Sequence, residues 1–225
     1  MNLPAQLERL YRLSGKGIEL GLDRVARAAE LLGNPQSRYP IVQIGGTNGK
    51  GTVSCLTAHA AVRAGLKTGL FPSPHLHRFS ERIRIDGQEC DADLLASHLA
   101  HIFDLLDDTP DLRLTFFEIA TLAALAVFAE MRVDLAVLEV GLGGRLDATT
   151  ITHPVLTAIT SIGMDHEQFL GHTPSEIAAE KGGIAKVGVP LVLGRITGEA
   201  LTVLEETASR VHAPLLRLDR EFRLP

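Results

Sequence analysis

Short apolar runs alternate along the chain with longer segments in which apolar residues recur every three or four positions. The apolar runs have the length of β-strands and cover Ile41–Ile44, Lys67–Phe71, Leu135–Val140, Val155–Ile159, Val189–Leu193 and Leu215–Leu218. The segments with helical periodicity cover residues 51–65, 92–107, 116–131, 174–186 and 197–211. Runs of Val, Ile, Leu and Ala are typical of strands buried on both faces, and their alternation with helices indicates parallel strand–helix–strand units. We therefore predict an α/β fold with a mostly parallel, doubly wound sheet flanked by helices.

The first 35 residues follow a different pattern, with amphipathic helices predicted around residues 3–13 and 23–32. We expect this segment to pack against the sheet as an accessory layer. Two later helix starts carry capping signals. Thr115–Glu118 and Thr173–Glu176 both have the Thr-x-x-Glu spacing of a capping box, and the second has proline at the first helical position.

Composition excludes several classes of function. The net charge is −5 and no basic stripe is visible, which argues against a nucleic-acid partner. Cys55 and Cys90 form no metal-ligand spacing, so they are expected to be reduced thiols of a cytosolic protein. No secretory signal is recognisable at the N-terminus, and no apolar stretch has the length of a membrane span. We therefore expect a cytoplasmic protein without a membrane partner.

A glycine-rich loop, Gly45–Thr52, connects the first predicted strand to a predicted helix. Glycines let backbone N–H groups approach phosphate oxygens, and the following helix directs its positive end at them. Lys50 would reach the terminal phosphates, and a nearby hydroxyl would help to hold Mg²⁺. The spacing of the glycines is one residue shorter than in the common pattern, and Gly51 stands in the Ser/Thr position, which leaves the hydroxyl to Thr52. The alternative is an ordinary strand-to-helix turn.

Polar residues also follow other predicted strands, and ligands bind beyond the carboxyl ends of the strands in an open parallel sheet. They are found in Ser73–Leu76, at Glu139 and in the Gly141–Asp147 segment after it, and at Asp165-His166. A carboxylate within a buried strand is costly unless it is paired or binds a cation. Glu139 is therefore predicted to be a direct or water-mediated Mg²⁺ ligand. The alternative is an ion pair with Arg145.

Each of the other candidates has an ordinary structural explanation as well. His166 can be a loop histidine, and Ser73 can begin a turn. Thr115 and Glu118 can serve only to cap a helix. Their coincidence at one edge of the sheet is what favours a functional site.

Lys181 lies on the apolar face of its predicted helix, because Ile177 and Ile184 share that face at helical spacing. Desolvation would lower the pKa of the lysine and make its neutral amine available for chemistry. The alternative is a lysine whose stem packs while its ammonium group reaches solvent.

Several of these motifs, taken in order, resemble the Mur ligase superfamily and, within it, its folate branch, the bacterial bifunctional dihydrofolate synthase/folylpolyglutamate synthases. The matching segments are Gly46–Thr52, Ser73–Leu76, Glu81–Ile83, Glu139–Thr149, Asp165-His166 and Glu180–Ile184. The resemblance extends from about Gly21 to Lys186. It implies a P-loop-type ATP-binding domain and an amide ligase that phosphorylates a carboxylate of its substrate and then joins it to L-glutamate.

The resemblance also implies roles for individual residues. The ATP phosphates would be held by Gly46, Thr47, Asn48, Gly49, Lys50, Gly51 and Thr52. Ser73, Glu139 and His166 match the Mg²⁺ ligands, and Lys181 matches a carbamylated lysine beside a second Mg²⁺, with K⁺ as a further candidate cation. Lys50, Lys181 and His166 are the implied catalytic residues. The segments that would hold dihydropteroate comprise Gly21, Leu22, Asp23, Arg24, Thr115, Phe116, Phe117, Glu118, Leu146, Asp147 and Ala148. The implied partners are dihydropteroate, folates and L-glutamate, bound by a monomer.

Some positions depart from the family pattern, namely Thr150 in place of asparagine, Glu167 in place of threonine and Gly182 in place of alanine. Family members also continue through the rest of the ATPase domain into a C-terminal Rossmann-like domain, which is absent from residues 1–225. We therefore expect one ATP-binding domain that is incomplete at its C-terminus. One alternative is a nucleotide-binding module without catalysis. Another is a cell-wall Mur ligase, against which the pteroate-like segments and Gly51 argue.

Overall fold

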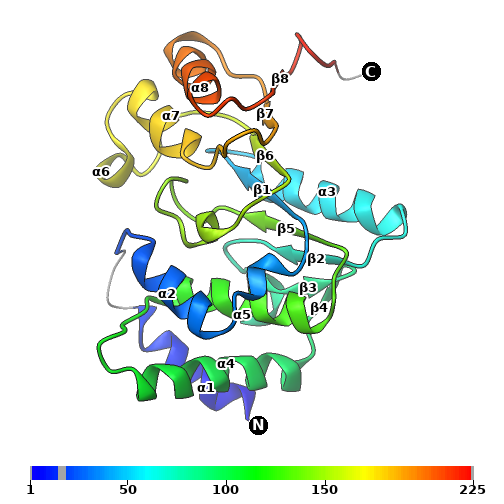
Figure 1. Ribbon diagram of the computed structural model, residues 1–225, viewed down its shortest axis with the longest axis vertical. Coiled ribbons are helices and arrows are strands. Elements are labelled where there is room, and N and C mark those ends of the chain that lie inside the picture. The colour runs from blue at the N-terminus through cyan, green and yellow to red at the C-terminus, as the bar shows by residue number, and fades with distance from the viewer. Residues whose placement is uncertain (1, 15–18, 224–225) are drawn as a thin grey trace.

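The computed structural model describes residues 2–14 and 19–223 and forms an eight-stranded sheet with helices on both faces (Figure 1). Residues 15–18, within the expected N-terminal helical segment, lie outside the described residues. The strands are β1 (Ile41–Gly45), β2 (Thr68–Phe71), β3 (Arg84–Ile85), β4 (Gln88–Glu89), β5 (Leu135–Glu139), β6 (Leu156–Ile159), β7 (Leu191–Leu193) and β8 (Leu215–Arg217). Their order across the sheet is β4-β3-β2-β5-β1-β6-β7-β8.

All neighbouring strands from β2 to β8 in this order pair in parallel, so the predicted mostly parallel sheet is confirmed. The antiparallel hairpin β3–β4 was not predicted, because two strands of two residues each are too short to leave an alternating pattern. Asp86 and Gly87 form its turn with φ of 51° and 82°. An Asp-Gly pair with two positive φ angles is the usual sequence signal of a tight hairpin, and it could have revealed this one.

Each predicted helix is present, with ends shifted by a few residues. The α-helices are α1 (Leu3–Tyr11), α2 (Asp23–Leu31), α3 (Lys50–Arg63), α4 (Ala92–Asp108), α5 (Phe116–Glu130), α6 (Glu167–Leu170), α7 (Pro174–Gly182) and α8 (Gly198–Arg210), and short 3-10 helices are η2 (Pro35–Ser37), η3 (Phe79–Arg82) and η4 (Ala148–Ile151). Both predicted capping boxes are confirmed, at the starts of α5 and α7. No helix of the described residues is long and apolar enough to cross a membrane.

Two apolar layers sandwich the centre of the sheet, with α3 on one side and α5 on the other (Figure 1). In β1, Val42 and Ile44 face α3, whereas Ile41 joins the larger core formed with α5, α4, α1 and α2. Beyond β1, α7 and α8 pack on each other and cover Ile159 of β6 and Leu191 of β7. Strands buried on both faces explain the continuous apolar runs in the sequence.

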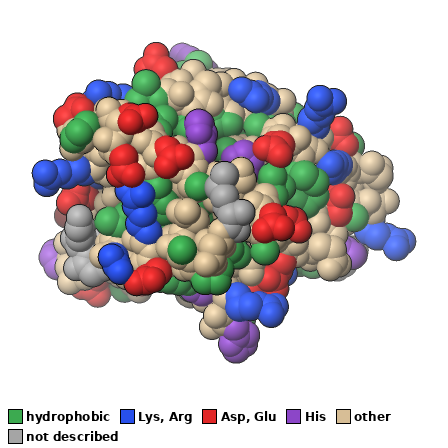
Figure 2. All heavy atoms as spheres, turned by 90° about the horizontal axis from the view of Figure 1, so that it is seen from below, with side chains coloured by type: hydrophobic (Ala, Val, Ile, Leu, Met, Phe, Trp, Pro, Cys, Tyr) green, Lys and Arg blue, Asp and Glu red, His purple; other side chains and the backbone are tan. Residues whose placement is uncertain are grey.

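The N-terminal helices were expected to lie against the sheet, but they pack mainly on other helices. The principal partners of α1 are α4 and α5, and those of α2 are α5 and η4. The reason is that α5 already covers this face of the sheet. Surface ion pairs link the outer layer, including Arg27 with Asp111 at 2.6 Å. Acidic and basic side chains are interspersed over the face seen in Figure 2, as expected of a surface without a strong single-sign field.

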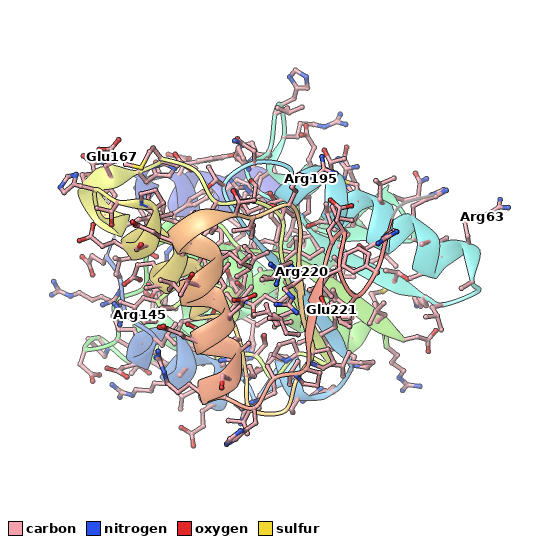
Figure 3. The ribbon with its side chains drawn as sticks, turned by 90° about the horizontal axis from the view of Figure 1, so that it is seen from above. Arg63, Arg145, Glu167, Arg195, Arg220 and Glu221 are labelled. Atoms are coloured by element: carbon pink, nitrogen blue, oxygen red, sulfur yellow. The ribbon has the colours of Figure 1, made fainter. Side chains whose placement is uncertain are left out.

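Ion pairs secure the edge strand β8 against α8. The guanidinium of Arg217 in β8 contacts Glu205 of α8 and Glu221, and Arg220 adds a second contact to Glu205 at 3.3 Å. Figure 3 shows Arg220 and Glu221 lying together beside this strand.

Gly69, in β2, allows α5 to approach the sheet. A Cβ atom at this position would lie 2.7–2.8 Å from ring atoms of the buried Phe128. We expect the Gly69→Ala variant to lose about 1–3 kcal/mol of unfolding free energy, because the ring has no free volume into which to move. Chemical denaturation followed by circular dichroism measures this loss.

The Phe128→Leu variant supplies the matched background. Removing the ring should make the Gly69→Ala change cost less in the double variant than in the wild type. An equal cost in both backgrounds would show that the ring is not the source of the strain.

Candidate active site at the carboxyl edge of the sheet

The loop between β1 and α3 is shaped by glycines at two positions that other residues would not tolerate. Gly46 has φ of 135°, and a Cβ atom there would lie 2.1 Å from the Thr160 hydroxyl. Gly49 has φ of 84° and precedes Lys50, the first residue of α3. The loop therefore brings backbone N–H groups and the N-terminal end of α3 to the carboxyl edge of the sheet, which is the arrangement that binds phosphate.

The loop that follows β6 holds this phosphate-binding loop in place. Thr47 N–H donates to the Ser161 carbonyl at 2.8 Å, and Asn48 N–H donates to the Ser161 hydroxyl at 3.0 Å. The Thr160 hydroxyl donates to the Asn48 carbonyl at 2.7 Å. Neither Thr160 nor Ser161 was predicted as a site residue. Their position directly after a predicted strand, at the same edge as the glycine loop, was the available signal.

Two lysines converge on the loop from different helices. Lys50 Nζ donates to the Thr47 carbonyl at 3.0 Å, and Lys181 Nζ, from α7, donates to the Gly46 carbonyl at 3.0 Å. Both line a small polar cavity of about 20 Å³. The other residues around it are Gly46, Val140, Gly141, Leu142, Gly143, Asp165 and His166.

Lys181 is buried, with only 2% of its surface exposed, as its position on the apolar helix face predicted. Burial, and after it the charge of Lys50, lowers its pKa from 10.5 to about 8, against the opposing effect of Asp165 and Asp147. Its ammonium group does not reach solvent, so the alternative of a snorkelling lysine is wrong. The neutral amine is therefore a minor form at neutral pH, roughly a tenth of the total, but it is far more populated than in an ordinary lysine.

Glu139 ends β5 with a buried carboxylate. Burial raises its pKa, while the hydrogen bond from the Ser73 N–H to Oε2, at 3.0 Å, and the charges of Lys50 and Arg82 oppose that rise. A Cβ atom on Gly51 would lie 3.5 Å from Oε2. The missing side chain in the usual Ser/Thr position of the loop thus leaves space in front of this carboxylate.

The alternative of an ion pair between Glu139 and Arg145 is wrong. Arg145, labelled in Figure 3, donates instead to Glu180 of α7 at 2.8 Å. The Arg145 N–H also donates to the Glu180 carbonyl. The segment after β5 turns back toward α7, so this arginine is drawn away from the strand that carries Glu139.

The residues matched to metal ligands fall into two groups. Ser73 and Glu139 contact each other, whereas His166 and Lys181 line the small polar cavity with Asp165. His166 is half exposed, and its Nε2 lies 3.5 Å from Asp165 Oδ1. No three His, Cys, Asp or Glu side chains gather as a metal cluster within residues 2–14 and 19–223. The carboxylates alone do not form a protein cage for a cation.

Asp147 shapes the loop after β5. Its buried carboxylate accepts hydrogen bonds from the N–H groups of Gly141 and Leu142, both at 2.9 Å, and from the N–H and hydroxyl of Thr149. Burial raises its pKa, and these hydrogen bonds oppose the rise. Both carboxylate oxygens are therefore engaged within the loop. The structure gives Asp147 a positioning role that the resemblance did not distinguish from direct contact with substrate.

A cavity of about 400 Å³ lies beside the small one and gathers most of the residues matched to dihydropteroate binding. These are Gly21, Thr115, Phe116, Phe117, Glu118, Leu146, Asp147 and Ala148. Leu22, Asp23 and Arg24 are not among its lining residues. Leu22 caps α2 and the other two begin it, and Arg24 donates to the Glu118 carboxylate at 3.2 Å. Arg82 also lines the cavity, although it was not among the predicted site residues.

Gly141 and Leu142 line both cavities. Gly141 is required there, since a Cβ atom would lie 2.6 Å from the Phe117 ring. One cavity is polar and adjoins the phosphate loop, and the other is largely apolar with a few polar groups. This arrangement suits a phosphate donor and an acceptor with an aromatic body that meet at the shared wall.

Comparison with known proteins gives strong matches over nearly the whole chain. A dihydrofolate synthase/folylpolyglutamate synthase of Haemophilus influenzae is 42% identical over 216 residues, which are 96% of this chain and 48% of that protein. The structure of Escherichia coli FolC in complex with DHPP and ADP has a TM-score of 0.91 at 37% identity and covers 99% of this chain and 53% of that one. An FPGS–AMPPCP–folate complex has a TM-score of 0.93 at 33% identity, over 100% and 56% of the two chains.

No family model matches the chain. The chain spans about half the length of the relatives it matches. The structural neighbours superpose on the same α/β domain, with the phosphate loop and both cavities inside the matched region. By sequence and by fold, the chain belongs to the dihydrofolate synthase/folylpolyglutamate synthase family of the Mur ligase superfamily, as a homologue of the N-terminal half of its relatives.

Proposed function

We propose that this chain binds ATP and the acceptor acid for an ATP-dependent amide ligase, which joins L-glutamate to dihydropteroate and to folate polyglutamates. The observation that carries the proposal is the shared wall of the two cavities at Gly141 and Leu142. It lets a carboxylate at the end of the large cavity meet phosphate groups at the glycine loop. The solved structures of relatives in complex with DHPP and ADP, or with AMPPCP and folate, support the pairing of these two ligands.

ATP would be held by the loop from Gly46 to Thr52 and by the start of α3. Lys50 would exchange its hydrogen bond to the Thr47 carbonyl for the terminal phosphates. The ties to Thr160 and Ser161 keep the loop in its binding shape before the nucleotide arrives. Such preorganisation lowers the conformational cost of binding.

Mg²⁺ fits the groups around the loop. Mg²⁺ in nucleotide sites is usually held by one or two carboxylates together with phosphate oxygens and water, so a protein cage is not required. Glu139 offers a buried carboxylate facing the space left by Gly51. We propose Ser73, Glu139 and His166 as its ligands, with K⁺ as a further candidate cation. When bound, Mg²⁺ would neutralise charge on the transferring phosphoryl group.

Lys181 would contribute as a carbamate. Its neutral amine adds to the carbon of CO₂, a proton leaves the nitrogen, and the product carries an anionic oxygen pair in place of a cation. The low pKa and the nearby His166 and Asp165 support this assignment for a second Mg²⁺. The change of sign also removes the repulsion between Lys181 and Lys50.

The reaction would begin with attack of an acceptor carboxylate oxygen on the γ-phosphorus of ATP. ADP leaves, and an acyl phosphate forms. The amino group of L-glutamate then attacks the acyl carbon, and inorganic phosphate leaves as the amide bond forms. Lys50 would stabilise the transferring charge, and the two cavities would hold the reacting oxygen and the phosphate in line.

The partners, oligomeric state and cellular location can be proposed as well. A net charge of −5 supports small-molecule partners over nucleic acid. We propose that it acts as a cytoplasmic monomer on dihydropteroate, folates and L-glutamate.

The reaction is tested by supplying the protein with Mg-ATP, dihydropteroate and L-glutamate. We expect ADP release that requires both other substrates, and a glutamylated product detected by mass spectrometry. ADP release that is unchanged when dihydropteroate or glutamate is omitted would overturn the ligase proposal. Binding of ATP and dihydropteroate without product would instead assign the chain as a binding module.

The phosphate loop is tested by the Lys50→Met variant. Loss of a charged hydrogen-bond donor to phosphate should weaken ATP binding by about 10- to 100-fold, which isothermal titration calorimetry measures. Lys67→Met is the matched control, because Lys67 precedes β2 and therefore lies at the opposite edge of the parallel sheet. Equal ATP affinity of the Lys50→Met variant and the control would contradict the assigned role of Lys50.

The free amine of Lys181 is tested in CO₂-free buffer, in which the carbamate does not form, by NMR titration of the lysine side-chain carbons, with the signal assigned by comparison with Lys181→Met. We expect a midpoint near pH 8, below the ordinary 10.5. The lowered pKa also determines how the stability of the fold changes with pH. The cost of burying the ammonium is present below about pH 8, and it is relieved as the pH rises toward 10.5, so this group makes the fold more stable across that interval. A midpoint at the ordinary value would refute the claim of an activated amine.

A further inference from the structure

Arg82, at the end of η3, is a buried guanidinium on the wall of the large cavity. It is only 7% exposed. No carboxylate of the described residues lies within 4.0 Å of its guanidinium nitrogens. Buried arginines are normally paired, because an ionised group without a partner in a low-dielectric environment is costly. The missing partner therefore points to an anion that enters the cavity.

A chain of hydrogen bonds holds the guanidinium in one orientation. Arg82 Nε donates to His75 Nδ1 at 2.6 Å, and His75 Nε2 lies 3.3 Å from the Tyr11 hydroxyl. This arrangement requires the neutral tautomer of His75 with its proton on Nε2.

Aromatic rings surround this chain and lower the local polarity. The guanidinium carbon of Arg82 lies 5.5 Å from the centre of the Phe116 ring, which itself stacks on Tyr11 and meets the edge of Phe79. Phe116 also lines the cavity. With Nε committed to His75, the two terminal nitrogens remain for a ligand. A planar fork of this kind matches a carboxylate, and the apolar surroundings strengthen the interaction.

Arg82 lies near the proposed reaction centre. Glu139 is close enough for its charge to act on Arg82, although the two form no ion pair, and Ser73, which bonds to Glu139, lines the same cavity as Arg82. A carboxylate bound by Arg82 would therefore lie toward the phosphate side of the cavity. Its aromatic body would occupy the part lined by Phe117, Leu146 and Ala148.

We propose that Arg82 binds the reacting carboxylate of the acceptor acid, held in orientation by His75 and Tyr11. The inference rests on the proposed function, since it assumes that the large cavity receives dihydropteroate. Arg82 then selects acids over neutral pterins and offsets the repulsion between the substrate carboxylate and the phosphates of ATP.

The test compares dihydropteroate with its primary carboxamide, which differs only in the carboxylate. Calorimetry in the presence of AMPPCP should show the acid binding the wild-type chain about 10- to 100-fold more tightly than the amide, as expected for charged hydrogen bonds. In Arg82→Met this preference should vanish while the affinity for the amide stays as in the wild type. Arg84→Met, which alters an arginine of β3 outside the cavity lining, is the matched control and should retain the preference.

The outcomes separate the two proposals. If the wild-type chain binds neither ligand, the proposed function is wrong. If it binds both but Arg82→Met keeps the preference for the acid, or loses affinity for acid and amide equally, the role of Arg82 is wrong. Should Arg82→Met fail to fold by circular dichroism, Arg82→Lys decides the matter. Lysine keeps the positive charge but lacks the two parallel N–H donors of the guanidinium, so this variant should reduce the preference for acid over amide at least several-fold. An unchanged preference would overturn the inference.

Discussion

The parallel pairing of β1 between β5 and β6 is the constraint on which the site depends. Ile44 pairs with Glu139 on one side, and Gly45 pairs with Ile159 on the other. This register brings three loops to the same edge of the sheet, directly beside one another. The phosphate loop, the buried carboxylate and the loop that holds Thr160 and Ser161 are therefore neighbours. A shift of one residue in either pairing would turn these side chains to the opposite faces and separate the groups.

Several buried charged side chains lie near the carboxyl edge of the sheet, and they differ in how completely other groups of the protein pair with them. Both carboxylate oxygens of Asp147 accept hydrogen bonds within its own loop, so this side chain stabilises the loop conformation. Lys181 has a single carbonyl partner and a lowered pKa, so its environment penalises the ammonium form relative to an ordinary lysine. Glu139 and Arg82 each retain atoms without a partner of opposite charge among the described residues. Incomplete satisfaction of buried polar groups costs stability, and it is typical of places where a ligand completes the set.

At two positions of this site, glycine is needed because a neighbouring side chain approaches the backbone too closely to leave room for a Cβ atom. Gly46 meets Thr160 and Gly141 meets Phe117, and in both cases a Cβ atom would overlap its neighbour. At Gly51 the spacing to Glu139 is ordinary van der Waals distance, so the glycine leaves open space instead. The same residue type therefore has two physical roles in adjacent parts of one site.

The local pattern of apolar and polar residues was sufficient to predict most of the strands and helices. The apolar runs and the helical periodicity located the six parallel strands and the main helices, because burial on both faces leaves a strong signal over short distances. The hairpin β3–β4 left too short a pattern, and only its Asp86-Gly87 turn marked it. The position of Lys181 on an apolar face was also predictable, since helical spacing alone determines which residues share a face.

Contacts between distant segments could not be predicted in this way. Arg145 pairs with Glu180, Ser161 holds the phosphate loop, and Tyr11 contacts His75. In each case the separation of the two residues in sequence carries no information about their distance in space. The sequence by itself determined the chemistry available at each strand end, because residue type and strand position are local properties. Only the tertiary structure decided which of those groups meet, because strand order and loop direction set by packing bring them together.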